Sequence, residues 1–412
     1  MTESYPRLRL KYAVELRRSR TEGSESELPY IGLENIESGT GKLITTTNAQ
    51  ETDDPSVVVV GESLSSVFQA GDILFGKLRP YLAKAWIAAF NGRCSTELLP
   101  LRPEKLNPRF GLYVMLSREF IDAVDGSTFG SKMPRADWAF IGNVPIPFPH
   151  RSTQERIADF LDRETSDIDA LITAKQRLLE LMAEKRRAIV AEAVMRGLDP
   201  SAPLRSSDVN WLGDIPAHWE VRRVATLFSQ RDERNQPDLP LLEVSINAGV
   251  IVREFSTDKI EGTAADFNTY KVARRGDIAF NKMRMWQGAV GVAPVDGLVS
   301  PDYTVATAKA ELLPEFAGQL FRTESFSAEC GRYSQGITWD RLRLYWDGFR
   351  DIFISVPPLD EQQQIVEYIS AETTKIDRLR AATENSIALL KERRAALVTA
   401  AVTGQIEIPE AA

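Results

Sequence analysis

The chain has 412 residues, of which 43% are hydrophobic and 26% are charged, and its formal net charge is −8. This length and composition predict two or more globular domains and exclude a wholly disordered chain, and no apolar run approaches the roughly 20 residues that a membrane-spanning helix needs. Two cysteines and two histidines are too few for a disulfide framework or a His/Cys metal centre, which favours a cytoplasmic protein.

The first part of the chain, residues 1–150, carries the segment "GDILFGKLRPYL" from Gly71. Gly-Asp predicts a turn and the apolar residues after it predict a short buried strand. Lys77 and Arg79 then alternate with Leu78, which predicts both cations on one face of a strand. Tyr81, Lys84 and Trp86 follow. Cations beside aromatic residues suit a DNA backbone and adjacent bases, whereas a solvated strand edge is the alternative.

A Gly/Ser-rich loop, "GSTFGSKMPRADW", closes this part and carries Lys132 and Arg135. Lys and Arg at the tips of such loops can reach base edges, although an ordinary connecting loop is an equal alternative. Before it, residues 107–126 have a helical pattern. Near the N-terminus, "SGTGK" at Ser38–Lys42 resembles half of a phosphate-binding loop, but Leu43 stands where Ser or Thr would bind magnesium.

Residues 151–197 predict a long helix. The segment from Gln154 contains neither Pro nor Gly for 41 residues and is rich in Ala, Leu, Glu, Lys and Arg. Its apolar residues recur in steps of three and four, as in a coiled coil. We expect the following residues in the packed seam: Ile157, Leu161, Ile168, Leu171 and Met182.

A linker and a second unit of mixed strands and helices occupy residues 198–357. The segment "GDIAFNKMRMWQ" from Gly276 repeats the earlier pattern, with Lys282, Arg284 and Trp286 as its basic and aromatic residues. Residues 313–332 again have a helical pattern. The closing loop, "GRYSQGITWDRLRLYW", supplies further candidates for DNA contact: Arg332, Gln335, Arg341 and Arg343.

Residues 358–405 predict a second long helix, followed by a tail at 406–412. This helix aligns without a gap on the first, and the identical pairs include Gln154/Gln362, Asp169/Asp377 and Arg186/Arg394. Its expected seam residues are Ile365, Ile369, Ile376, Leu379 and Leu390. The chain is therefore a duplicated α+β unit. A pseudo-twofold relation between the halves predicts that the two helices pair as an antiparallel coiled coil.

Several of these segments resemble the specificity subunit of type I restriction-modification systems. The resemblance rests on "GDILFGKLRPYLAK", "CSTELLPLRP", "WLGDIPAHWEVRRV" and the two Q-x-x-I…E-T…I-D helices after "PIPFP" and "VPPLDEQ". It covers essentially the whole chain. In the second unit, "NKMRMWQGA" departs from the family's usual "KLRPYLxK".

The resemblance implies two target-recognition domains, twisted β-sheets with helices, joined by the two long helices. Each domain would read one half of a split DNA sequence. It further implies two partner adenine methyltransferase subunits and two restriction subunits with translocase and nuclease activity. S-adenosylmethionine, ATP and Mg would then belong to those partners, and this chain would bind no cofactor or metal and catalyse nothing.

Two other functions remain open on the residues alone. A stand-alone enzyme acting on DNA would need a cofactor loop or an acidic metal cluster, and neither pattern is present. A coiled-coil adaptor or structural protein without nucleic-acid recognition would explain the helices. It would not explain why the Lys/Arg segment occurs twice.

Overall fold

The chain folds into two compact units that share two long helices. The computed structural model describes residues 5–22, 27–44, 64–130, 132–253, 267–336, 338 and 341–409. Unit 1 comprises residues 1–177 and 383–412, and unit 2 comprises residues 178–382. None of the helices in the described ranges is long and apolar enough to cross a membrane.

Unit 1 is built on two four-stranded sheets, with strand orders β2-β9-β6-β7 and β3-β5-β8-β4, and on the strand pair β1-β10. Its strands are β1 (Arg7–Arg9), β2 (Val14–Leu16), β3 (Arg20–Glu22), β4 (Tyr30–Ile31), β5 (Leu64–Phe68), β6 (Ile73–Gly76), β7 (Ala85–Ile87), β8 (Gly92–Cys94), β9 (Leu98–Pro103) and β10 (Pro145–Pro147). Its short helices are η1 (Leu10–Tyr12), η3 (Leu33–Asn35), η4 (Pro80–Leu82), α1 (Pro108–Leu116), α2 (Arg118–Asp125) and α3 (Trp138–Ile141).

Strand β6 lies at the centre of unit 1, and its alternating side chains enter two cores. Ile73 and Phe75 belong to the core that α1 and α2 cover. Leu74, which points the other way, belongs to the core between the two sheets, where Trp86 also lies. The helical pattern at 107–126 is confirmed, but as two helices, with the Asn107 side chain accepting hydrogen bonds at the start of α1.

Unit 2 repeats this plan, with the four-stranded sheet β14-β21-β18-β19 in the place of β2-β9-β6-β7. Its strands are β11 (Leu204–Ser206), β12 (Asp214–Pro216), β13 (Glu220–Arg223), β14 (Phe228–Arg231), β15 (Leu242–Ser245), β16 (Gly249–Val252), β17 (Lys271–Ala273), β18 (Ile278–Asn281), β19 (Val290–Val292), β20 (Gly297–Val299), β21 (Tyr303–Ala308) and β22 (Phe353–Val356). Its short helices are α5 (Val224–Leu227), η5 (Phe267–Thr269), η6 (Met285–Gln287), α6 (Pro314–Phe321), α7 (Glu324–Tyr333) and α8 (Trp346–Asp351).

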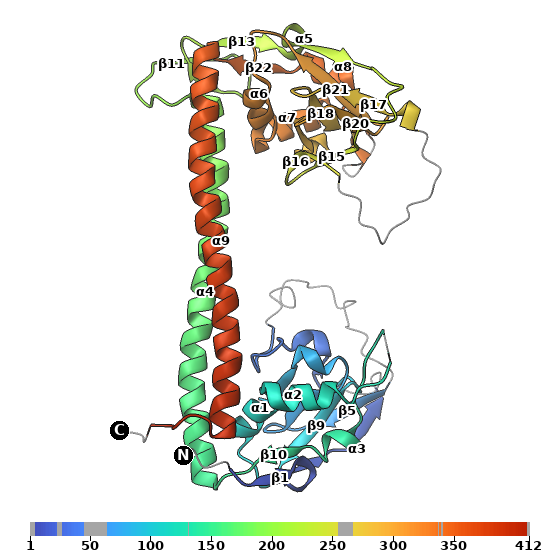
Figure 1. Cartoon of the computed structure of the whole chain (residues 1–412), viewed down its shortest axis with the longest axis vertical. Helices are drawn as coiled ribbons and strands as arrows, with labels where there is room; N and C mark the ends of the chain where they lie inside the picture. Colours follow the sequence, from blue (N-terminus) through green and yellow to red (C-terminus); the bar gives the residue numbers. More distant parts are fainter. Residues whose placement is uncertain are drawn as a thin grey trace. The chain divides into compact units, whose positions relative to one another are not determined.

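The long helices are α4 (Arg151–Arg196) and α9 (Leu359–Thr403), of 46 and 45 residues. In unit 1, Ile157 near the start of α4 shares a core with Val398 near the end of α9. In unit 2, Val194 near the end of α4 shares a core with Ile365 near the start of α9. Each helix thus begins where the other ends (Figure 1), which confirms the antiparallel pair and the α+β repeat.

The identical glutamines at the starts of the two helices make the same contacts in both units. Gln154 accepts a hydrogen bond from the Asn107 backbone N–H (2.8 Å) and donates to the Pro149 carbonyl (2.9 Å). Gln362 accepts from the Leu313 backbone N–H (2.8 Å) and donates to the Pro357 carbonyl (2.9 Å). Because both side chains are buried, each fixes its helix to the adjacent domain.

Two of the expected seam residues lie outside the seam. Leu171 is 47% exposed and Leu379 is 55% exposed, whereas Ile172 is buried. An α-helix has 3.6 residues per turn, so a strict heptad pattern drifts round the helix, and the buried row continues from Ile168 to Ile172. Of the other expected residues, Ile376 and Leu390 are half-buried, and the rest are buried: Ile157, Leu161, Ile168, Met182, Ile365 and Ile369.

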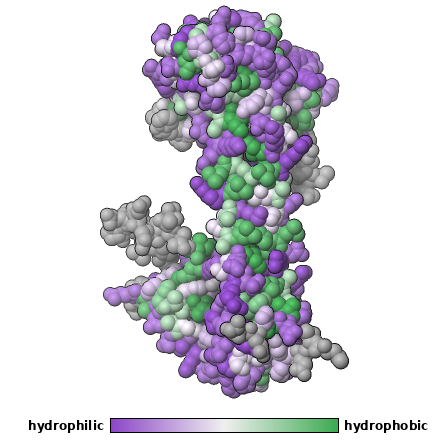
Figure 2. Space-filling view, turned by 90° about the vertical axis from the view of Figure 1, so that its left-hand side faces the viewer, coloured by the Kyte–Doolittle hydropathy of each residue, from purple (hydrophilic) through white to green (hydrophobic). Residues whose placement is uncertain are grey.

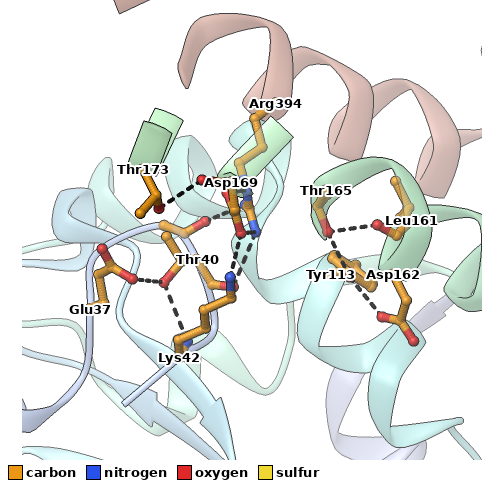
Figure 3. Close-up of polar contacts among 11 residues, drawn as sticks. Glu37, Thr40, Lys42, Tyr113, Leu161, Asp162, Thr165, Asp169, Thr173 and Arg394 are labelled. Atoms are coloured by element: carbon orange, nitrogen blue, oxygen red, sulfur yellow. Dashed lines mark hydrogen bonds and ion pairs between the residues drawn. The ribbon is translucent and has the colours of Figure 1, made fainter. Parts of the chain in front are cut away.

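A buried ion pair joins the two helices in unit 1 (Figure 3). The Arg394 Nε donates to Asp169 (2.8 Å), and its Nη1 donates to the carbonyl of Gly39 (2.7 Å). Lys42 also contacts Asp169 (2.7 Å). The turn at Ser38–Lys42, which resembles half of a phosphate-binding loop, therefore contacts both long helices, through Arg394 and Asp169.

The same pair recurs in unit 2 as Arg186 and Asp377, at 2.5 Å. There the side chains are 43% and 55% exposed, against 7% and 15% for Arg394 and Asp169. Replacing the arginine of each pair by alanine removes the same charge from a largely buried site and from an exposed one. The difference in stability between the two variants therefore measures the effect of burial.

We predict that Arg394→Ala destabilises the unit 1 helix pair by about 3 kcal/mol, because Asp169 keeps only Lys42 as a charged partner and the carbonyls of Gly39 and Thr40 lose their donor. Hydrogen–deuterium exchange in residues 383–403 should accelerate about a hundredfold. The matched variant Arg186→Ala should cost less than about 1 kcal/mol. Equal acceleration in both variants would contradict the assigned role of burial.

Candidate nucleic-acid interface

The Gly-Asp half of the repeated segment is a structural turn. Gly71 and Gly276 have φ of +88° and +89°, a conformation that glycine adopts without strain. The buried Asp72 carboxylate accepts from Arg17 Nε and from the Gln69 N–H. Asp277 makes the equivalent ion pair with Arg231, at 2.6 Å. The recurrence of this half therefore follows from the fold.

The basic half lies beyond the strands, so the expectation of a shared strand face is wrong. Strands β6 and β18 end at Gly76 and Asn281, immediately before the lysines. In unit 1, Arg79 adopts a left-handed conformation (φ 50°) before Pro80 begins η4. Proline has no backbone N–H and cannot extend the ladder. In unit 2, the Asn281 side chain accepts from the Met283 N–H (2.9 Å) and turns the chain.

In both units the basic turn that follows the strand, residues 77–79 in unit 1 and 282–284 in unit 2, forms backbone hydrogen bonds with the closing loop. In unit 1, the Arg79 N–H donates to the Pro134 carbonyl (2.8 Å), and the Ala136 N–H donates to the Lys77 carbonyl (3.0 Å). In unit 2, the Leu344 N–H donates to the Lys282 carbonyl (2.9 Å). The two basic segments that the sequence singled out separately thus lie side by side twice.

In unit 1, part of the predicted set is engaged within the domain. Arg135 forms an ion pair with Glu97 (2.9 Å), and the Lys84 ammonium donates to the Leu33 carbonyl (2.6 Å). Trp86 is 7% exposed and packs edge-on against Phe68, so it is a core residue and cannot stack on a base.

The remaining unit 1 candidates are available at the surface. Arg79 and Lys132 are exposed and Lys77 is half-buried, and within the described ranges the structure gives their side chains no ion-pair partner. Tyr81 is 53% exposed. Phe129 is 66% exposed in the same loop, and the sequence reasoning missed it because an aromatic residue in a Gly/Ser-rich loop carries no periodic signal.

In unit 2, the exposed candidates are Arg284, Gln335, Arg341 and Arg343, with Lys282 half-buried. Arg343 and Gln335 face each other through two backbone hydrogen bonds of 2.9 Å. Arg332 pairs with Glu329 (3.2 Å). The Trp286 ring is half-buried, and its Nε1 donates to the Met283 carbonyl (3.0 Å). Cations and exposed polar groups thus gather at one end of the central sheet of each unit, an arrangement that suits DNA phosphates.

The described residues contain no group of three or more His, Cys, Asp or Glu side chains that could hold a metal ion. Burial raises the pKa of the Cys94 thiol to about 12, so this thiol is not a nucleophile at neutral pH.

Comparisons with known proteins agree with the repeat. The family model described as the type I restriction modification DNA specificity domain matches residues 29–181 and again residues 216–388. The type I restriction enzyme EcoDI specificity subunit of Escherichia coli is 26% identical over 126 residues, 31% of this chain and 28% of that one. This match thus spans little more than a quarter of that relative's length.

Two solved structures share the fold along 98% of both chains. The HsdS subunit from Thermoanaerobacter tengcongensis has 17% identity and a TM-score of 0.53. A chain from a structure on complex assembly and conformational transition of the type I R-M system has 18% identity and a TM-score of 0.65.

We predict that Arg79→Ala weakens binding of the full chain to duplex DNA and lowers the slope of log K against log salt concentration by about 1, since one phosphate contact is lost. Fluorescence anisotropy over a salt series measures both. Arg102→Ala is the matched control, because Arg102 is exposed near the opposite end of β9 and pairs with Glu15. An unchanged slope for Arg79→Ala would show that Arg79 does not contact a DNA phosphate.

Proposed function

Because the chain belongs to the family of type I restriction-modification DNA specificity domains, we propose that it reads a two-part DNA target and directs partner subunits to it. Unit 1 would read one half of the target and unit 2 the other. The observation that carries this proposal is the meeting of the basic turn and the closing loop in both units. A coiled-coil adaptor without DNA recognition has no use for that repetition.

We further propose that the chain is non-catalytic and works in the cytoplasm, where its DNA target lies. The methyl donor S-adenosylmethionine, and the ATP and Mg of restriction, would be bound by the partner methyltransferase and restriction subunits. This division is supported by a surface that offers cations and exposed aromatic rings of the kind that bind DNA phosphates and bases.

The exposed leucines of the long helices support two equivalent docking sites for the methyltransferase. Figure 2 shows apolar patches on the surface of the helix pair. Leu171 (47% exposed) and Leu389 (65%) lie in unit 1, and their repeat equivalents Leu379 (55%) and Leu181 (45%) lie in unit 2. Contiguous apolar patches on a surface mark protein interfaces, and because the repeat relates the two pairs of leucines, a partner that fits one pair fits the other.

We predict that Leu171→Glu with Leu389→Glu removes one of two methyltransferase copies, and that the additional changes Leu379→Glu and Leu181→Glu remove both. Each buried leucine contributes about 2 kcal/mol, so each pair of substitutions should weaken one site about a thousandfold. Native mass spectrometry of the complex gives the stoichiometry. Gln176→Glu is the control, since it adds a charge to the same helix without removing apolar surface. Two bound methyltransferase copies in every variant would show that the methyltransferase docks on another surface.

The function is tested by mapping N6-methyladenine in the genome of a host that expresses the chain with its partner methyltransferase. We predict one motif with two specified halves and a fixed gap. The chain expressed alone should give no methylation. A motif without a gap, or methylation by the chain alone, would contradict the proposal.

The long helices are proposed to set that gap. Four residues inserted into both α4 and α9 add about 6 Å of helix, which should lengthen the gap by about two base pairs at 3.4 Å each. The same methylation map reports the gap, and the two half-sites serve as the internal control because neither should change. An unchanged gap would show that the helices do not act as the spacer.

A further inference from the structure

A polar groove of about 680 Å³ opens in unit 2 beside the basic turn. It is lined by β15, by the end of β18 and by the start of β21, and its polar groups include Glu243, Asn281, Arg284 and Tyr303. Among these, Arg284 was the candidate for DNA contact in the sequence. The pairing of β18 with β21 places Asn281 beside Tyr303, and Glu243 reaches the groove from β15.

The groove offers both hydrogen-bond donors and acceptors. Along β15, Leu242 and Val244 are buried, whereas Glu243 is exposed and lines the groove. Neither the Glu243 carboxylate nor the Arg284 guanidinium is given a hydrogen-bond or ion-pair partner within the described ranges. Burial, followed by the charge of Glu243, raises the pKa of the Tyr303 hydroxyl above its usual value, so this hydroxyl stays protonated and can donate.

Asn281 also turns the chain through its bond with the Met283 N–H, but the ladder that both units share does not require an amide and a phenol at this position. Asn281 pairs with Tyr303 in the ladder between β18 and β21, and Gly76 pairs with Leu98 at the equivalent position of unit 1. There Leu98 is buried in the core between the sheets. The same backbone therefore accepts a glycine and a leucine where unit 2 has an amide and a phenol. This difference points to a ligand that unit 2 alone recognises.

The carboxylate of Glu243 favours recognition of DNA bases over binding of the phosphate backbone. Phosphates repel Glu243, whereas the exocyclic amino group of cytosine donates to carboxylates, and an arginine beside it can donate to the guanine of a neighbouring pair. Resting on the proposed function, we propose that this groove reads base edges in the major groove of one half-site. Glu243 accepts from an amino group, and Arg284 and Tyr303 donate to base acceptors.

The test is a comparison of methylation motifs for the full chain with its partner methyltransferase. Glu243→Gln replaces an acceptor oxygen with a donor and should reduce discrimination at one position of one half-site about tenfold. Tyr303→Phe should likewise relax a position in the same half-site. The other half-site and the gap should stay unchanged. Glu220→Gln, the same chemical change on exposed β13 of the same unit, should leave the whole motif unaltered.

The outcomes separate the two proposals. A normal motif that neither Glu243→Gln nor Tyr303→Phe alters would overturn the groove assignment alone. An equal loss of methylation at all sequences would also overturn it, because a positioning or folding role affects every sequence alike. Absence of any two-part motif with the unaltered chain would overturn the proposed function, and the groove assignment with it.

Discussion

The buried apolar side chains at the two ends of the helix pair belong to the helices and to the domain cores at once. Ile157, Leu161 and Val398 complete the core of unit 1, and Val194 and Ile365 complete that of unit 2. Neither core is closed without a turn from each helix, since the first turns of one pack with the last turns of the other. The glutamines at the helix starts add hydrogen bonds that hold each helix in one rotational setting.

Residues that are identical in the two long helices make the same contact in both units, but their burial differs. Asp169, Arg394 and their equivalents join helix to helix, and in unit 1 the Gly39 carbonyl and Lys42 also contact the pair. A charge pair in such a place is stabilising only while every partner is present. The unit 2 pair is more exposed and is made through the Arg186 Nη1 alone, so it contributes less to stability. The ion pair is therefore present in both units, and the packing around it determines how much it contributes to stability.

The Gly-Asp segment shows a similar division within a few residues. Its first half is repeated because a positive φ and a buried carboxylate with its arginine partner allow few alternatives. Its second half leaves the strand and places cations beside the closing loop. Variation is tolerated there, and Asn281 with Tyr303 in unit 2 stands where unit 1 has Gly76 with Leu98. Differences of this kind let two copies of one fold recognise different sequences.

The sequence by itself determined the duplication, the two long helices, their antiparallel pairing and the family, because periodicity and repeated identities are properties of the linear chain. Only the tertiary structure decided where the strands end, that Leu171 and Leu379 leave the seam, and that Trp86 is a core residue. It also decided which cations are engaged, since Arg135 meets Glu97 and Lys84 meets the Leu33 carbonyl. Those outcomes depend on contacts between residues far apart in the chain, as does the meeting of Glu243 with Tyr303. No local pattern encodes such contacts.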